Sequence, residues 1–89
     1  MKSFELLLAT YPDLDADIIG ALHRYVHHKI PTGGFLEAVL ANDLIGAVNH
    51  ADHINLHRLR PICSYIYNEM PSDCFGSYVM VSDWLNKGN

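Results

Sequence analysis

Positive charge is scarce in this sequence. Six Lys and Arg residues stand against ten Asp and Glu residues, which gives a formal net charge of −4 at pH 7. Proteins that bind nucleic acids usually present a basic face, because counterions released from the phosphates supply much of their affinity. Here the basic residues are scattered along the chain. The sequence therefore argues against duplex DNA, and against an anionic membrane surface, as the partner.

Long apolar runs and cysteines are also few. No apolar stretch approaches the roughly 20 residues that span a bilayer. The run Leu6–Leu8 follows Glu5 and is too short for the core of a secretory signal. Cys63 and Cys74 allow only one pairing. We therefore expect a cytoplasmic protein with reduced thiols and no membrane partner.

The sequence motifs of metal binding are missing. It has no Cys-x-x-Cys pair, and no glutamate completes a zincin motif between its histidines. His50, His53 and His57 would share one face if their segment were a single helix, and imidazoles so spaced can bind zinc or nickel. These three histidines are the candidate metal ligands of the sequence. Surface histidines beside Arg and Asp are the simpler interpretation, so we expect no metal and no cofactor.

Catalytic motifs are missing as well. Ser77 lacks the Gly-x-Ser-x-Gly elbow of serine hydrolases. Cys74 is the candidate nucleophile, because a thiol in a loop just before a helix can have a lowered pKa. Free cysteines in small helical proteins are more often packing residues. We therefore expect a protein that is not an enzyme, with a metal-dependent or thiol enzyme as the last-ranked alternative.

Apolar residues recur at helical spacing along most of the chain. With 89 residues, of which 49% are apolar, the chain has enough material for one modest core. No segment shows the strict alternation of a strand. The sequence thus predicts an all-α fold, a small compact bundle of five or six short helices, in a single helical domain over residues 1–89. We expect Leu36, Leu40, Ile62 and Ile66 in its core.

Polar residues mark where these helices begin. Ser3, Asp13 or Asp15, Thr32, Asp43 and Ser77 are the predicted N-caps, since their side chains can accept a hydrogen bond from a free backbone N–H group. Asn42-Asp43 predicts either a break or two polar residues on one continuous helix, and we favour the break. Pro61 either begins a helix or kinks a longer one, and we favour the beginning, because a proline in the first turn is tolerated.

The stretch Ile30–Leu44 joins the two halves of the chain. Thr32-Gly33-Gly34 at a helix start could cradle an anion, but a tight turn with close helix packing explains the glycines better. Packing does not explain the polar edge of this stretch or the polar residues that follow it. We therefore predict an interaction surface that contains Thr32, Glu37, Asn42, Asp43, Asp52 and Asn55.

From Pro31 onward the chain resembles a family of short, uncharacterised proteins of tailed phages and prophages. The matching residues cover about two thirds of the chain: Pro31-Thr32-Gly33-Gly34-Phe35-Leu36, Ala38-Val39-Leu40, Asn42-Asp43-Leu44, Ala47, Ala51-Asp52, Asn55, Tyr67-Asn68, Pro71, Cys74, Gly76-Ser77 and Trp84-Leu85. Phe75 stands where the family has tryptophan, and the histidines at 50, 53 and 57 are not part of the pattern. The resemblance implies a phage or prophage origin and no particular activity.

Together these features favour a protein that acts by binding. Its surplus of aromatic residues points the same way, because tyrosine and tryptophan are enriched at interface hot spots. We expect a small phage-type protein that binds a host bacterial protein or complex and modulates or inhibits it, with a defence system as the concrete target. A small helical nucleic-acid-binding regulator is the alternative, since two helices joined around Pro31–Gly34 suit it. A homodimer is a side expectation, because pairing adds buried area to a small domain.

Overall fold

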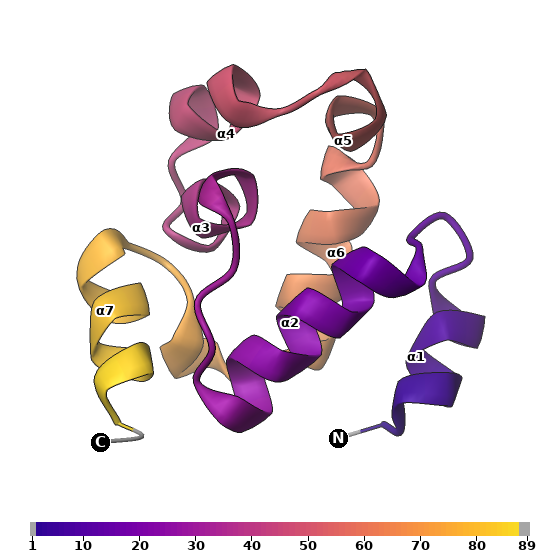
Figure 1. Cartoon of the computed structure of the whole chain (residues 1–89), viewed down its shortest axis with the longest axis horizontal. Coiled ribbons are helices and arrows are strands. Elements are labelled where there is room, and N and C mark those ends of the chain that lie inside the picture. The colour runs from indigo at the N-terminus through magenta and orange to yellow at the C-terminus, as the bar shows by residue number, and fades with distance from the viewer. Residues whose placement is uncertain (1, 88–89) are drawn as a thin grey trace.

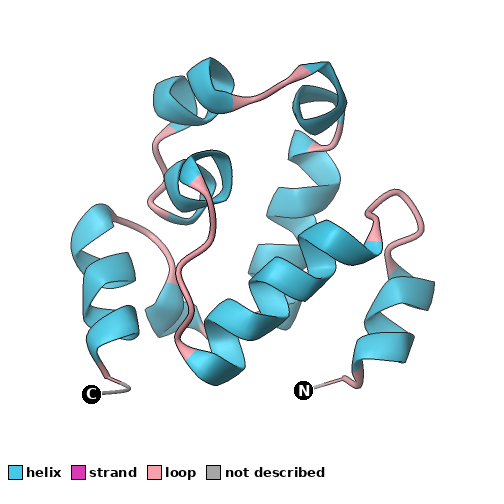
Figure 2. Cartoon of the chain, viewed as in Figure 1, coloured by secondary structure: helices cyan, strands magenta, loops and turns pink. Residues whose placement is uncertain are grey.

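The chain consists of helices joined by short loops (Figures 1 and 2) in a computed structural model that describes residues 2–87. The elements in chain order are α1 (Phe4–Thr10), α2 (Ala16–His28), α3 (Gly34–Leu40), α4 (Leu44–His50), α5 (His53–His57), α6 (Leu59–Glu69), the 3₁₀ turn η1 (Ser72–Cys74) and α7 (Tyr78–Asn86). No strand occurs among these residues. The all-α prediction is confirmed, but the expected five or six helices are seven in the part described.

The number of helices is higher than expected because the short helices between residues 34 and 69 stay separate and do not join into longer ones. At Asn42 the backbone φ is 60°, in the left-handed region that ends helices. The Asp43 carboxylate then accepts a hydrogen bond from the Gly46 N–H at 3.0 Å and starts α4. Asp52 starts α5 in the same way, through the Asn55 N–H at 2.7 Å. The predicted break at Asn42-Asp43 is thus confirmed.

Pro61 lies in the first turn of α6. The preceding helix α5 ends at His57, and α6 begins at Leu59, two residues before the predicted start. The missing N–H of a proline costs little there, because the first N–H groups of a helix have no partner within it. The favoured interpretation, two helices rather than one kinked helix, is confirmed.

The other predicted caps divide into three that are confirmed and one that is wrong. Ser3, Asp15 and Ser77 each accept a hydrogen bond from the N–H three residues later, at 3.3, 3.0 and 3.1 Å. Thr32 does not cap α3, because Gly33 occupies the N-cap position and makes no side-chain bond. The Thr32 hydroxyl instead donates to the Gly33 carbonyl at 3.3 Å.

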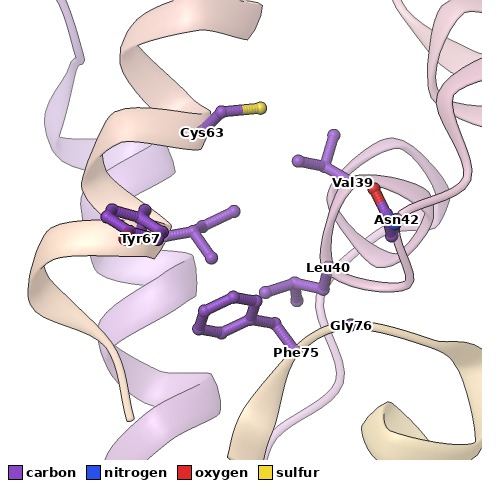
Figure 3. A pocket seen from close by; sticks show the side chains of 8 residues that line it. Val39, Leu40, Asn42, Cys63, Tyr67, Phe75 and Gly76 are labelled. Atoms are coloured by element: carbon purple, nitrogen blue, oxygen red, sulfur yellow. The ribbon is translucent and has the colours of Figure 1, made fainter. Parts of the chain in front are cut away.

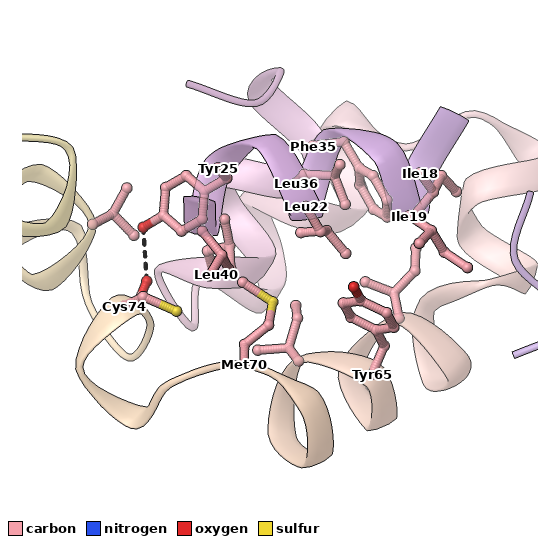
Figure 4. Packing of buried hydrophobic residues seen from close by; sticks show 14 of the residues in the cluster. Ile18, Ile19, Leu22, Tyr25, Phe35, Leu36, Leu40, Tyr65, Met70 and Cys74 are labelled. Carbon is pink, nitrogen blue, oxygen red and sulfur yellow. Dashed lines mark hydrogen bonds between the residues drawn. The ribbon is translucent and has the colours of Figure 1, made fainter. Parts of the chain in front are cut away.

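The core is built around α2, which supplies its longest buried face (Figure 4). That face meets buried side chains of α3 and α6, so that residues distant in sequence form one apolar cluster. The four predicted core residues are all confirmed as buried: Leu36, Leu40, Ile62 and Ile66. Full burial of aliphatic side chains of this kind supplies most of the folding free energy of a small domain.

Two hydrogen bonds tie α7 and the preceding loop to α2. The Tyr25 hydroxyl donates to the Cys74 carbonyl at 2.7 Å, the dashed line in Figure 4. The Trp84 indole N–H donates to the Tyr25 carbonyl at 3.0 Å. The Lys29 ammonium lies 3.8 Å from the centre of the Trp84 ring, a cation–π distance. The last helix is therefore fixed to the core by polar contacts as well as by packing.

The molecule is thin in one direction, with extents of 32 × 31 × 18 Å. Because a helix with its side chains is about 10 Å across, no more than two helices stack through the thickness, and grooves between helices open onto a face. In Figure 1, which looks down the short axis, α2 runs between α1 and α7, and α4 and α5 lie along the top edge. No helix between residues 2 and 87 has the length and apolar character that crossing a bilayer requires.

Candidate functional site

An apolar groove opens between the end of α3 and the outer side of α6 (Figure 3). Its volume is about 340 Å³, and none of the described residues that line it carries a charge. Those residues are Val39, Leu40, Asn42, Cys63, Ile66, Tyr67, Phe75 and Gly76. We call this set the α3–α6 groove.

A second, smaller hollow of about 70 Å³ adjoins it. The two share Val39, Asn42 and Cys63, and the smaller one continues towards α4 through Leu44. The two hollows therefore form one continuous depression along α3. Such a shape suits successive apolar side chains of a partner better than a single compact ligand.

Backbone contacts hold the walls of the groove. The Gly76 N–H donates to the Leu40 carbonyl at 2.7 Å, which brings Phe75 against the end of α3. Gly76 has φ +132°, a conformation that residues with side chains rarely adopt, and a side chain there would also meet Met80. The Asp43 N–H donates to the Ala38 carbonyl at 2.8 Å and fixes the turn that presents Asn42. The groove is thus preformed by the fold.

The rim of the groove carries the most exposed aromatic residue of the described chain. Tyr67 is 79% exposed, whereas Tyr25 and Tyr65 are fully buried. Cys63, one turn earlier on α6, is also exposed, and its pKa is raised because neighbouring groups partly desolvate the thiol. Tyr78 is half exposed. Most aromatic residues therefore serve the core, and Tyr67 is the one available at the groove.

The six predicted interaction residues do not all line one hollow. Asn42 and Asp43 are brought together, and both line the smaller hollow. Glu37 lines a different hollow, beside Tyr78 and α7. Thr32 lies in the loop before α3 and lines none of the hollows that we describe.

Two of the predicted residues, Asp43 and Asp52, are helix N-caps. Asp43 caps α4 and also accepts a 2.5 Å hydrogen bond from the Tyr78 hydroxyl. That bond and the one from the Gly46 N–H hold the pKa of Asp43 below its ordinary value. Asp52 caps α5 through the N–H of Asn55. The polar edge is thus explained in part by helix capping, which the sequence predicted for Asp43 but not for Asp52.

The histidine candidates are divided between two helices. His50 is the last residue of α4, while His53 and His57 are the first and last residues of α5. Between residues 2 and 87, no three His, Cys, Asp or Glu side chains are grouped so that they could hold a metal ion. The single-face arrangement required one continuous helix, and the Asp52 cap interrupts it. The His50 ring packs against Gly34 instead, where an added Cβ would lie 3.4 Å from its Nδ1 atom.

The Cys74 thiol is not placed for nucleophilic chemistry. Its side chain is fully buried, and burial raises its pKa to about 11, with the nearby Asp73 carboxylate adding to the effect. The expectation that its position before a helix could lower the pKa is therefore wrong. The 3₁₀ turn directs the side chain into the core, where desolvation outweighs any effect of the helix end.

Sequence reasoning missed most of the α3–α6 groove. Cys63 and Tyr67 are four residues apart, so they share the side of α6 that faces away from buried Ile62 and Tyr65. That spacing was readable in the sequence. The approach of Phe75 was not, because it depends on a contact between segments distant in the chain.

Comparison with known proteins adds no relative. No protein-family model, curated protein or solved structure matches this chain. The functional argument therefore rests on the groove and on the surface around it.

Proposed function

We propose that this chain is a non-enzymatic, phage-type protein of the bacterial host cytoplasm, which binds a host protein or complex and modulates or inhibits it, a defence system being the concrete target. The observation that carries the proposal is the α3–α6 groove, an uncharged, preformed depression with an exposed tyrosine on its rim. Exposed tyrosines beside apolar pockets are typical of protein-binding hot spots.

The groove selects for the apolar face of a helix in the partner. The α3–α6 groove, of about 340 Å³, lies between α3 and α6, and the smaller hollow of about 70 Å³ extends it towards α4. Several apolar side chains on the same face of a helix would occupy them together. The Asn42 amide and the Tyr67 hydroxyl supply hydrogen bonds at the edge.

The geometry favours this function over the nucleic-acid alternative. In a helix–turn–helix around Pro31–Gly34, α3 would have to read the groove of the nucleic acid. Four of its seven residues are buried, and the charged residue that it exposes is Glu37, which repels phosphate. Protein binding needs no such exposed basic helix.

Capture of the partner from host lysate tests the proposal. Tagged wild type is compared with Tyr67→Asp, which puts a charge at the groove, and with Val79→Asp, a control on α7 that is 69% exposed and lines no hollow described here. We expect wild type and Val79→Asp to retain the same host protein, and Tyr67→Asp to retain at least about tenfold less. Equal retention by all three, or no retention by wild type, would refute the proposal.

Once a partner has been identified, the alkylation rate of Cys63 reports whether that partner covers the groove. Cys63 is an exposed thiol in the groove wall, while Cys74 is fully buried and serves as the internal control. We expect a saturating amount of partner to slow alkylation of Cys63 at least about tenfold and to leave Cys74 unreacted. An unchanged Cys63 rate in the complex would place the partner elsewhere and overturn the groove assignment.

A further inference from the structure

Helices α4 and α5 contribute little to the buried core of the described chain. Of their twelve residues only Ala47 is buried. Five large apolar side chains point outward instead, with exposed fractions of 44 to 75%. They are Leu44, Ile45, Val48, Ile54 and Leu56. We call this set the α4–α5 rim.

The rim is distinct from the greater part of the α3–α6 groove. Only Leu44 belongs to a lining of that groove, in its smaller hollow. Leu44 and Ile45 both neighbour Val48 on the surface of α4, since residues three and four positions apart are neighbours on a helix. Figure 1 shows α4 and α5 along one edge of the molecule, with α3 between α4 and the C-terminal end of α2.

We propose that the α4–α5 rim is the interface of a homodimer, in which α4 packs against α4 of a second copy across a two-fold axis. Helices of seven and five residues are marginal in water unless a tertiary contact covers their apolar face. A second copy that packs α4 against α4 would cover these side chains in both chains at once.

The charge pattern permits two copies to meet there. Each copy carries a net charge of −4, so most apposed surfaces would repel. Residues 44–49 contain no charged side chain, and Asp43 at the start of α4 is held by Tyr78 of its own chain. In a two-fold interface the same patch faces itself, which a neutral apolar helix face tolerates.

The exposed apolar area of the α4–α5 rim is of the same order as the area that one partner buries in a protein interface. Five side chains exposed to this extent present on the order of 500 Å² of apolar surface, against the roughly 800 Å² that each partner buries in a standard interface. The neighbouring exposed residues Asn49, His50 and His53 can supply the polar remainder. Patches of roughly 300–600 Å² are the largest that a typical monomer exposes, and they are often functional.

Light scattering over a concentration series tests the dimer with purified protein. The variants are Ile45→Asp, at a residue 75% exposed in the monomer, and Val79→Asp as the matched control on α7. We expect wild type and Val79→Asp to rise from 10.0 kDa towards twice that mass. Because the substitution occurs twice in a two-fold interface, Ile45→Asp should raise the dissociation constant at least about 100-fold.

Amide hydrogen exchange supplies the second measurement. In wild type, exchange over residues 44–57 should slow as concentration rises, while Ile45→Asp should show no such dependence. Circular dichroism establishes that each variant is folded. Wild type that stays at 10.0 kDa at the highest attainable concentration, or Ile45→Asp that associates as wild type does, would overturn the dimer. Neither result bears on capture of a host protein, which is read at Tyr67.

Discussion

Helix α2 and the pair α4–α5 take part in the fold in opposite ways. Six of the thirteen residues of α2 are buried, including Ile19, Leu22 and Tyr25, which are fully covered. The pair α4–α5 buries one residue of twelve and exposes five large apolar ones. Apolar content alone thus does not decide whether a helix builds the core.

Buried apolar residues on α2 and exposed apolar residues on α4 and α5 have different effects, the first on stability and the second on association. Apolar side chains on α2 stabilise the monomer, because folding removes them from water. Those on α4 and α5 remain in contact with water, so their removal from water is still available as a driving force for association. The same residue types therefore have different consequences when they are mutated in the two regions.

The largest expected effect is the loss of a core side chain from α2. Leu22→Ala should lower the free energy of unfolding by about 2–5 kcal/mol, because it leaves a cavity in a closely packed core. Ile45→Ala on α4 should change it by less than about 0.5 kcal/mol at a concentration where the protein is monomeric. Chemical denaturation measures both. Similar losses for the two variants would show that α4 is anchored as firmly as α2.

The next effect distinguishes two fully buried tyrosines of the core. The Tyr25 hydroxyl donates to the Cys74 carbonyl, whereas the Tyr65 hydroxyl has no hydrogen-bond partner among the described residues. Burial raises the pKa of Tyr65 to about 12, so the group stays neutral. Tyr25→Phe should cost about 1–2 kcal/mol, and Tyr65→Phe should leave stability unchanged or raise it by up to about 1 kcal/mol.

Denaturation of the two phenylalanine variants beside wild type checks this expectation. The substitutions remove the same atom from equally buried rings, so each is the control for the other. If Tyr65→Phe were as destabilising as Tyr25→Phe, the Tyr65 hydroxyl would have to make a bond that contributes to folding.

Local signals in the sequence predicted much of this fold. Ser3, Asp43 and Ser77 were identified as caps because a cap depends on residues within one turn. For α2 the sequence left Asp13 and Asp15 open, and the cap is Asp15. Thr32 was misassigned because Gly33 also suits an N-cap, and local sequence does not decide between neighbours. The core positions of α3 and α6 followed from their apolar spacing.

Other features depend on contacts between distant segments. The apolar pattern of Leu36, Leu40 and Leu44 continues into α4, yet Leu44 is 65% exposed because Asn42 turns the chain before it. The position of Cys74 before a helix made it a candidate nucleophile, but its side chain is fully buried. Sequence spacing shows which residues share a face of a helix, but not whether another element covers that face.

Acid should loosen α4 before it loosens α2. Both helices begin at an aspartate whose pKa is lowered from 3.8, at Asp15 mainly by the Ile18 N–H and at Asp43 mainly by the Tyr78 hydroxyl. A carboxyl with a lowered pKa contributes stability above 3.8, and this is lost as the pH falls through the folded-state value. After its cap is protonated, α2 still has six buried residues to hold it, whereas α4 has one.

Amide chemical shifts recorded from about pH 5 down to about pH 2.5 follow the two helices separately. We expect residues 44–50 to lose helical shifts before residues 16–28. Asp43→Asn retains a good N-cap that does not titrate in this range, so it should keep α4 folded to lower pH. If both helices were lost at the same pH and Asp43→Asn had no effect, acid would not loosen α4 before α2.

The smallest effect compares two helix caps, a carboxylate and a hydroxyl, in unequal surroundings. Asp52→Ala removes the cap of α5, which buries no residue, and should lower the free energy of local opening over residues 53–57 by about 1 kcal/mol with little change in global unfolding. Ser77→Ala removes the cap of α7, which Trp84 fixes to α2. That helix opens only with the core, so its loss of about 1 kcal/mol should appear in global unfolding. Hydrogen exchange read residue by residue measures both quantities, and a global loss from Asp52→Ala would mean that α5 belongs to the cooperative core after all.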